Sequence, residues 1–187
     1  MNQAQMLAKA DKSVLVLIDI QQRLIAAMPK DISNQLIRQT KILLQAADSL
    51  HIPVMITEQY PKGLGHSEPE LLTITAENSV IEKTCFSCAN VDEFMVRLHT
   101  SNRRQIILTG MESHICVLQT ALQLQSQGFQ VFIIEDAVCS RTKQNHNNAL
   151  HRCRQAGVII SNTESVLFEW LADAKHKQFR TLSRLIV

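Results

Sequence analysis

The sequence predicts one α/β domain, residues 1–187, built on a mostly parallel sheet of about six strands. Short runs of apolar and β-branched residues alternate along the chain with stretches in which apolar residues recur every three or four positions. The runs are typical of strands buried on both faces, and the periodic stretches are typical of amphipathic helices. Because the connections are short and no repeat or low-complexity tract interrupts the pattern, we expect βαβ units in a single domain.

The predicted strands share a short apolar centre bounded by turn residues or charges. The clearest is residues 13–19, a continuous apolar run that ends in the carboxylate of Asp19. The full set of predicted strands is residues 13–19, 52–57, 79–83, 105–109, 130–134 and 158–160.

Helical periodicity occupies the stretches between and after these strands. The predicted helices are residues 32–50, 90–98, 116–127, 143–156 and 163–170. Gly128 and Gly157 are suited to end two of them, because glycine adopts the left-handed conformation of a helix C-terminus. The proline- and glycine-rich loop 58–70 is predicted to border a site or a partner surface. The tail, residues 175–187, mixes charged and apolar side chains and is expected to dock on a neighbouring surface.

Composition excludes several classes of protein. A formal charge of +2 is too small to indicate nucleic acid or a membrane surface as the main partner. No apolar run approaches the length of a membrane span, and residues 1–12 are polar without a signal-peptide core, so we expect a cytoplasmic protein. The five cysteines are expected to be reduced thiols. Cys85 and Cys88 have CxxC spacing, but no second pair follows at zinc-finger spacing.

Three reactive side chains lie at equivalent places in the predicted fold. Asp19, Lys83 and Cys116 each stand at or just past the carboxyl end of a predicted parallel strand. If those strands are neighbours, the three converge on one crevice, at the edge where open α/β sheets bind ligands. Taken singly, each has an ordinary structural explanation as a cap, a surface lysine or a core thiol. The shared position favours a catalytic interpretation.

The chemistry of this set is that of a cysteine nucleophile. Cys116 opens a predicted helix, and the helix N-terminus and the Lys83 ammonium are both expected to favour its thiolate. Asp19 can take the thiol proton and return it to a leaving group. The backbone N–H groups around Glu112 and Cys116 can form an oxyanion hole.

Other kinds of site find little support in the sequence. The glycine-rich loop near Gly63 and Gly65 lacks the GxGxxG and GK[ST] patterns, which argues against dinucleotide or P-loop phosphate binding. The histidines form no HxxxH pair, which argues against a catalytic metal. We therefore expect no cofactor and no metal.

Several segments together resemble one known family across nearly the whole chain. The matching segments are residues 17–21, 57–61, 82–87, 110–117 with 119–121, 136–137 with 140–141, and 163–165. On these motifs the chain resembles the isochorismatase-like cysteine hydrolases. The resemblance implies a Rossmann-like, three-layer α/β/α fold and an Asp-Lys-Cys triad, here Asp19, Lys83 and Cys116. It also implies a cis peptide between Met111 and Glu112, with the amides of Glu112 and Cys116 forming the oxyanion hole.

Departures from the pattern indicate the branch of the family. Isochorismatases proper lack the cysteine, so Cys116 implies amidase-like chemistry through an acyl-enzyme. Nicotinamidases carry an Asp-x-His metal site after the second strand, whereas this chain offers only His66 there. The loop resembles that of short isochorismatase-domain hydrolases, most of whose substrates are unassigned. Members of the family often form dimers or larger homo-oligomers.

Two functions from different classes follow. The first is a cysteine hydrolase that acts on the C–N bond of a small amide or a related carbonyl compound. The second is a non-catalytic homo-oligomeric scaffold or binding protein on the same fold, in which Cys116 is an oxidation-sensitive thiol. The three polar groups present together favour the hydrolase.

Overall fold

Six parallel strands form one sheet in the order β3-β2-β1-β4-β5-β6. The computed structural model describes residues 6–75 and 80–186. The strands are β1 (Ser13–Ile18), β2 (Val54–Gln59), β3 (Val80–Lys83), β4 (Gln105–Met111), β5 (Gln130–Cys139) and β6 (Ile159–Ser161). Ser79 and Val187, which belong to the predicted third strand and tail, lie outside the described residues.

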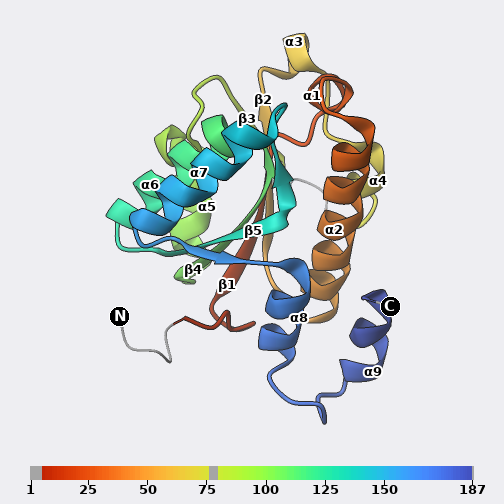
Figure 1. Cartoon of the computed structure of the whole chain (residues 1–187). Coiled ribbons are helices and arrows are strands. Elements are labelled where there is room, and N and C mark those ends of the chain that lie inside the picture. The colour runs from red at the N-terminus through yellow and green to blue at the C-terminus, as the bar shows by residue number, and fades with distance from the viewer. Residues whose placement is uncertain (1–5, 76–79, 187) are drawn as a thin grey trace.

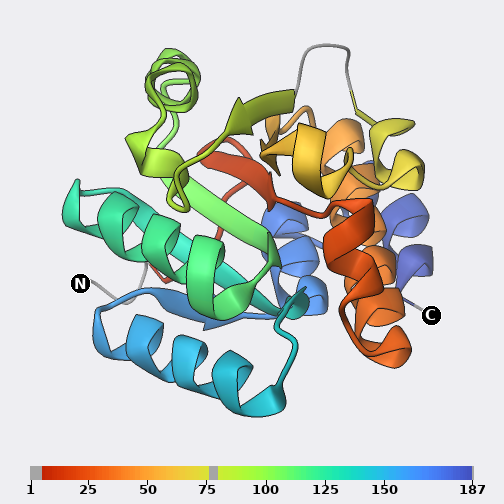
Figure 2. The same ribbon diagram turned by 90° about the horizontal axis from the view of Figure 1, so that it is seen from above.

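Helices cover both faces of the sheet, and the views in Figures 1 and 2 show the three layers. On one face lie α2 (Lys30–Ser49) and α8 (Thr163–Leu171), and on the other lie α5 (Asp92–Thr100), α6 (Leu118–Ser126) and α7 (Lys143–Gln155). The shorter helices are α1 (Gln22–Ala26), α3 (Pro61–Leu64), α4 (Pro69–Leu72) and α9 (Phe179–Leu182). Within the part of the chain that is described, no helix combines the length and apolarity needed to cross a membrane.

The central strand β1 explains why the sheet needs two helical layers. All its residues are buried, and its side chains alternate between two apolar cores. Leu15 and Leu17 pack with α2 and α8, whereas Val14 and Val16 pack with α5, α6 and α7. A strand with apolar side chains on both faces is stable only where both faces are covered. The predicted three-layer α/β/α fold with a six-stranded parallel sheet is confirmed.

The strand order reverses beside β1. From β1 the chain adds β2 and then β3 on one side, and it returns to place β4, β5 and β6 on the other. The carboxyl ends of β1 and β4 therefore flank the point where the two halves diverge. Open α/β sheets bind ligands at such a point, because the connections on either side leave in opposite directions.

Two segments differ from the sequence-based expectation. The strand predicted to end at Ile134 continues to Cys139, because β5 resumes pairing with β4 after a shift in register. The polar residues Glu135 and Asp136 fall in that irregularity, and for this reason they resemble a strand end in the sequence. The loop 58–70 contains α3 and the start of α4, each of which begins with a proline at its first position.

The C-terminal tail packs on the core of its own chain. Leu182 of α9 is buried, and Phe179, Leu185 and Ile186 pack against the same apolar cluster as α2 and α8. The apolar residues that predicted docking thus cover the outer side of the α2–α8 layer.

Gly110 lets β4 approach the end of β1, where Asp19 follows. It has φ 113°, and a Cβ at this position would lie 2.0 Å from the carbonyl oxygen of Ile18. Since Ile18 O is backbone, no side-chain movement can relieve this overlap.

We expect Gly110→Ala to lower the free energy of unfolding by about 4 kcal/mol or more. The control is Gly128→Ala, which has φ 84° but no atom within 4 Å of an added Cβ, and its cost should be about 1 kcal/mol. Urea unfolding of both variants measures the difference. Equal losses would show that left-handed φ, and not the contact with β1, sets the requirement.

Candidate active site

The Asp19 carboxylate lies at the centre of a buried polar cluster. Asp19 follows β1 with a left-handed φ of 52° and is fully buried. Its Oδ1 accepts a hydrogen bond of 2.7 Å from Thr57 Oγ1, and its Oδ2 accepts one of 2.6 Å from Lys83 Nζ. Strands β1, β2 and β3 thus each contribute one group, and an ion pair forms without contact with water.

Lys83 reaches Asp19 from the edge strand β3, across β2. Its Nζ also donates to Gln59 Oε1 at 2.7 Å and lies 3.3 Å and 3.2 Å from the carbonyl oxygens of Cys85 and Phe86. Burial is the largest single effect on the pKa of Lys83 and lowers it, but the charge of Asp19, its hydrogen bond to Lys83 and the nearby Cys88 and Cys116 together hold the pKa above its usual value. The ammonium is therefore a fixed positive charge at this site.

Cys116 completes the group from the other side of β1. It lies in a π-helical turn, Ser113–Val117, that joins β4 to α6, and its thiol is close enough to the Asp19 carboxylate for the two groups to interact. Only 6% of the residue is exposed. The structure therefore brings Asp19, Lys83 and Cys116 together, as their positions in the sequence suggested.

The protonation of Cys116 differs from the sequence-based expectation. Burial raises the pKa of the Cys116 thiol, the negative charge of Asp19 raises it further, and the opposing effect of Lys83 is smaller. The expectation considered only the positive fields of Lys83 and the helix terminus. Since Asp19 already neutralises Lys83, a thiolate would be a second, uncompensated negative charge in a buried site. The resting residue is a thiol beside a carboxylate.

Three further residues of the cluster were missed in the sequence analysis. Thr57 and Gln59 hold Asp19 and Lys83, and Cys88 holds Thr57 through a contact of 3.8 Å from its Sγ to Thr57 Oγ1. Burial and the Asp19 charge raise the pKa of Cys88 to about 11. Thr57 and Gln59 were visible as polar residues at the end of an otherwise apolar strand, whereas Cys88 was noted only for its CxxC spacing with Cys85 and not as a neighbour of Asp19.

The turn before Cys116 has an unusual backbone. The peptide bond between Met111 and Glu112 is cis. The Glu112 carbonyl oxygen accepts hydrogen bonds from the N–H groups of Ile115 at 3.0 Å and Val117 at 3.3 Å. This carbonyl closes the π-helical turn, and the turn sets the position of Cys116.

The Glu112 side chain also points into the protein. Its Oε1 accepts a hydrogen bond of 2.7 Å from Arg141 Nε, and its Oε2 lies 3.6 Å from His114 Nε2. The next two side chains are held from the same direction. Ser113 Oγ lies 3.1 Å from His146 Nδ1, and His114 Nδ1 lies 3.0 Å from Ser140 Oγ.

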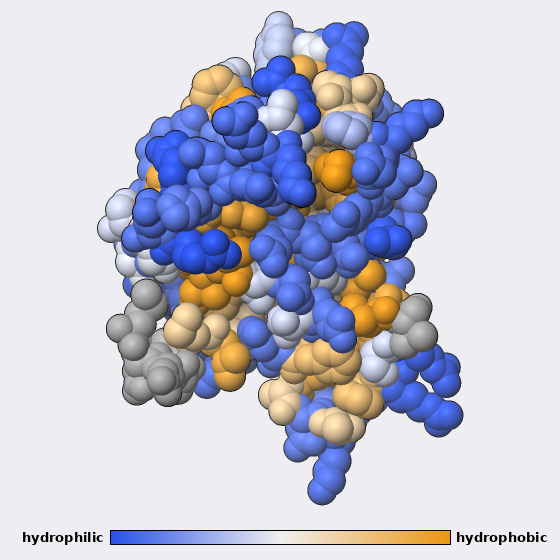
Figure 3. Space-filling view, viewed as in Figure 1, coloured by the Kyte–Doolittle hydropathy of each residue, from blue (hydrophilic) through white to orange (hydrophobic). Residues whose placement is uncertain are grey.

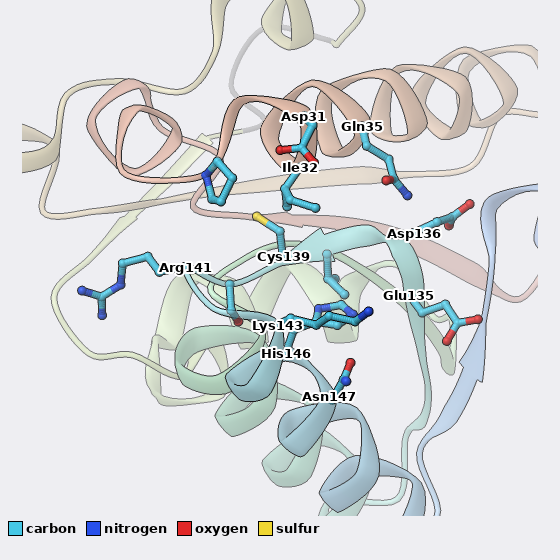
Figure 4. Close-up of a pocket in the computed structure, with 13 residues that line it drawn as sticks. Asp31, Ile32, Gln35, Glu135, Asp136, Cys139, Arg141, Lys143, His146 and Asn147 are labelled. Carbon is cyan, nitrogen blue, oxygen red and sulfur yellow. The ribbon is translucent and has the colours of Figure 1, made fainter.

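A cavity of about 440 Å³ lies between the start of α2 and the β5–α7 connection. Figure 4 shows Asp31, Ile32 and Gln35 of α2 on one side and Lys143 and His146 on the other. None of Asp19, Lys83 and Cys116 lines it, although Ser140, Arg141 and His146 contribute to its wall. The wall of the cavity thus includes residues that contact the segment 112–114, but the cavity does not reach the buried ion pair.

His66, the one histidine noted in the loop after the second strand, pairs with a carboxylate. Its Nδ1 lies 3.0 Å from Glu58 Oε2, and Glu58 Oε1 accepts from the Ser67 N–H at 2.7 Å. Among residues 6–75 and 80–186, no three His, Cys, Asp or Glu side chains are grouped so that they could hold a metal ion.

Solved structures with this fold include several hydrolases. The MAR1 ribonuclease of Caenorhabditis elegans superimposes with a TM-score of 0.89 at 33% identity, covering 96% of this chain and 91% of that one. The YcaC gene product of Escherichia coli, described as an octameric hydrolase of unknown specificity, gives 0.89 at 21%, covering 96% and 89%. YcaC of Pseudomonas aeruginosa, solved with covalent acrylamide, gives 0.84 at 20%, covering 96% and 95%. The two YcaC likenesses show the fold alone.

Sequence comparison identifies the family. Isochorismatase family protein 1B of Dictyostelium discoideum is 36% identical over 176 residues, covering 92% of this chain and 84% of that protein. The isochorismatase domain model matches residues 13–165, from the first residue of β1 into α8. With all six strands inside that match, the chain belongs to the isochorismatase family and is a hydrolase of that family.

Proposed function

We propose that the protein is a cysteine-dependent hydrolase that cleaves the C–N bond of a small amide, or a related carbonyl compound, through a thioester acyl-enzyme. The observation that carries this proposal is the buried chain of contacts from Lys83 through Asp19 to Cys116. A carboxylate in contact with a thiol can take its proton at the moment of attack. Burial of all three groups keeps water from competing for that proton.

The acylation step begins from the protonated thiol. Asp19 takes the proton from Cys116 as the sulfur forms a bond to the carbonyl carbon of the amide. The negative charge that develops on the carbonyl oxygen is stabilised by the backbone N–H groups that we assign to Glu112 and Cys116. The C–N bond then breaks, and Asp19 returns the proton to the leaving amine.

The second half of the cycle removes the acyl group. Asp19 takes a proton from a water molecule as its oxygen attacks the thioester carbon, and the C–S bond breaks. The proton on Asp19 returns to the sulfur, so the sum is amide plus water giving acid plus amine. Lys83 remains charged throughout and balances the negative charge that moves between Asp19 and Cys116.

The substrate class follows from the size of the site and from chemistry. Cys116 is almost fully buried, so the reacting group must be small or lie at the end of a narrow side chain. In YcaC of Pseudomonas aeruginosa acrylamide is bound covalently, and this supports the ability of the fold to hold a primary amide. The described residues around Asp19 and Cys116 supply their own base and nucleophile, so the proposed cycle has no step that uses a metal.

We further propose that the chain forms a homo-oligomer. The YcaC gene product of Escherichia coli is octameric, and this chain exposes Met6, Leu7 and Phe168 beside a hollow lined by Ala8 and Trp170. Figure 3 shows apolar residues in the lower half of this face, where Figure 1 places α8 and α9. Sedimentation equilibrium measures the mass, and a monomer at micromolar concentration would contradict the proposal.

The name of the Caenorhabditis elegans structure raises a second candidate, RNA cleavage. Against it stand the formal charge of +2 and the burial of Asp19, Lys83 and Cys116, since a polynucleotide backbone needs an open basic groove. The two candidates are separated by giving the same preparation RNA and small amides.

Cys116→Ala and Asp19→Ala should each abolish turnover in a panel of primary amides and anilides and leave the fold intact. The panel is followed by release of ammonia or the aniline, with circular dichroism as a check on folding. The control is Cys153→Ala, which removes a buried thiol of α7 in the core behind the site.

Full activity in folded Cys116→Ala or Asp19→Ala would disprove the proposed roles. Cleavage of single-stranded RNA by the native protein but not by Cys116→Ala would replace the amide with a phosphodiester. No turnover or acylation with any amide would favour the non-catalytic scaffold.

Asp19→Asn should move the pH profile of Cys116 alkylation by iodoacetamide to lower pH. The negative charge of Asp19 raises the pKa of Cys116, so its removal, with Lys83 still positive, favours the thiolate. Peptide mass spectrometry measures the midpoint. Cys153 is the internal reference, since burial raises its pKa to about 11 and Asp19 is not among the groups that shift it. An unchanged or higher midpoint would show that Asp19 does not act on the thiol.

A further inference from the structure

The carboxylate of Glu112 is buried and carries one strong hydrogen bond. The residue is 6% exposed, Oε1 accepts from Arg141 Nε at 2.7 Å, and Oε2 has no hydrogen-bond partner. A buried carboxylate is costly unless an opposite charge meets it, and a charge-assisted hydrogen bond to a guanidinium is the strongest kind of support available to it. Arg141 is therefore the main anchor of this side chain.

Arg141 belongs to a different element from the residue that it holds. It follows β5, whereas Glu112 follows β4. Its side chain is 57% exposed, and Figure 4 shows its guanidinium turned away from Lys143 and His146. The contact thus joins the surface of the β5–α7 connection to the turn that carries Cys116.

The neighbouring contacts are weaker but act in the same direction. Ser140 and Asn145 lie at hydrogen-bond distance from the ring of His114, at 3.0 Å and 3.3 Å, and His146 meets Ser113 at 3.1 Å. Three consecutive side chains, residues 112–114, are therefore held by the β5–α7 connection and the first turns of α7. Among these contacts only the Arg141–Glu112 pair is a hydrogen bond between opposite charges within 3 Å.

We propose that Arg141 is a positioning residue that fixes the backbone N–H of Glu112 in the oxyanion hole by holding the Glu112 carboxylate. The inference rests on the proposed function, since it assumes that this N–H meets the developing oxyanion. The Glu112 carbonyl is fixed by Ile115 and Val117, so the side chain is the second constraint on the residue. When the carboxylate loses its anchor, the whole residue can rotate, and displacement of a donor by a fraction of an ångström weakens transition-state stabilisation.

Two alkylating probes separate the oxyanion hole from the thiol. In the reaction with acrylamide, the Cys116 sulfur bonds to the terminal carbon, and the C=C π pair moves through the α-carbon onto the amide oxygen. The proton lost by the thiol ends on the α-carbon. Iodoacetamide reacts by displacement of iodide at a saturated carbon, and no charge develops on its carbonyl oxygen. The ratio of the two rates therefore reports support of the oxyanion, independent of how readily Cys116 ionises.

Arg141→Gln should lower the rate of Cys116 alkylation by acrylamide about 10-fold, less than the loss of a whole oxyanion donor. The iodoacetamide rate should stay within about 2-fold, because the thiol and Asp19 are untouched. Peptide mass spectrometry measures both rates at one pH. The matched control is Arg154→Gln, an exposed arginine of α7 whose side chain has no described hydrogen bond or ion pair, and it should change neither rate.

A double-mutant cycle identifies the path of the effect. In a Glu112→Gln background, Arg141→Gln should have little further effect on the acrylamide rate if Arg141 acts through the carboxylate. Arg141→Lys keeps the charge but loses the Nε geometry, and it should recover only part of the rate.

The outcomes distinguish two failures. If native Cys116 reacts with acrylamide no faster than Cys85, the proposed oxyanion site itself fails. If native Cys116 reacts selectively but Arg141→Gln leaves the ratio of rates unchanged, the site stands and the positioning role of Arg141 is wrong. A parallel fall in both rates shows a general structural effect and also overturns the inference.

Discussion

The buried ion pair between Lys83 and Asp19 is the interaction on which the rest of the site depends. Removal of two charges from water costs several kcal/mol for each ion, and this cost is offset only when the geometry is good and the remaining polar atoms are paired. Here both conditions are met. Thr57 donates a hydrogen bond to the second carboxylate oxygen of Asp19, and Lys83 donates to Gln59 and to two backbone carbonyl groups. The pair fixes the charge state of the site before any substrate enters.

The fold makes this pair possible through the order of its strands. Asp19 and Lys83 are 64 residues apart in the chain, and they meet because β1, β2 and β3 are consecutive and parallel. Cys116 arrives from the opposite side because β4 returns to pair with β1. Close approach of β4 to the end of β1 in turn requires Gly110, where no side chain fits. The order of the strands thus brings the reactive groups together, and each group lies at or just after the end of its strand.

The same arrangement explains why Cys116 rests as a thiol. A lone lysine beside a cysteine would favour the thiolate, but here the lysine is already paired with a carboxylate. The site stores one proton, on sulfur, next to the group that can accept it. In the proposed cycle this proton passes to Asp19 as the sulfur attacks a carbonyl. Negative charge then develops on the sulfur only in the transition state and not in the resting enzyme.

Much of the fold could be predicted from the sequence because it depends on the periodicity of apolar residues and on the glycines that end helices. The run 13–18 is apolar at every position after Ser13. Gly128 and Gly157 have positive φ and follow the ends of two helices. The positions of Asp19, Lys83 and Cys116 at or just after strand ends could also be predicted from the sequence. The sequence did not reveal the second half of β5, where Glu135 and Asp136 interrupt the apolar pattern at an irregularity in pairing.

Contacts between distant segments lay beyond sequence reasoning. Arg141 and Glu112 are 29 residues apart, and no pattern in the sequence pairs their side chains. The raised pKa of Cys116 likewise depends on burial and on the distance to Asp19, which are properties of the packed structure. Sequence motifs and the periodicity of apolar residues indicate which strand ends come together. The packed structure determines the protonation state of each group and the contacts that hold it.

The most direct measurement is the mass of the Cys116 peptide from protein that is quenched in acid while it turns over the best amide of the panel. The account predicts an added acyl group on Cys116 that hydroxylamine removes, as expected of a thioester, and no such adduct on Cys85, Cys88, Cys139 or Cys153. Steady turnover with no acyl group on Cys116 at any quench time, together with persistent turnover in Cys116→Ala, would contradict it.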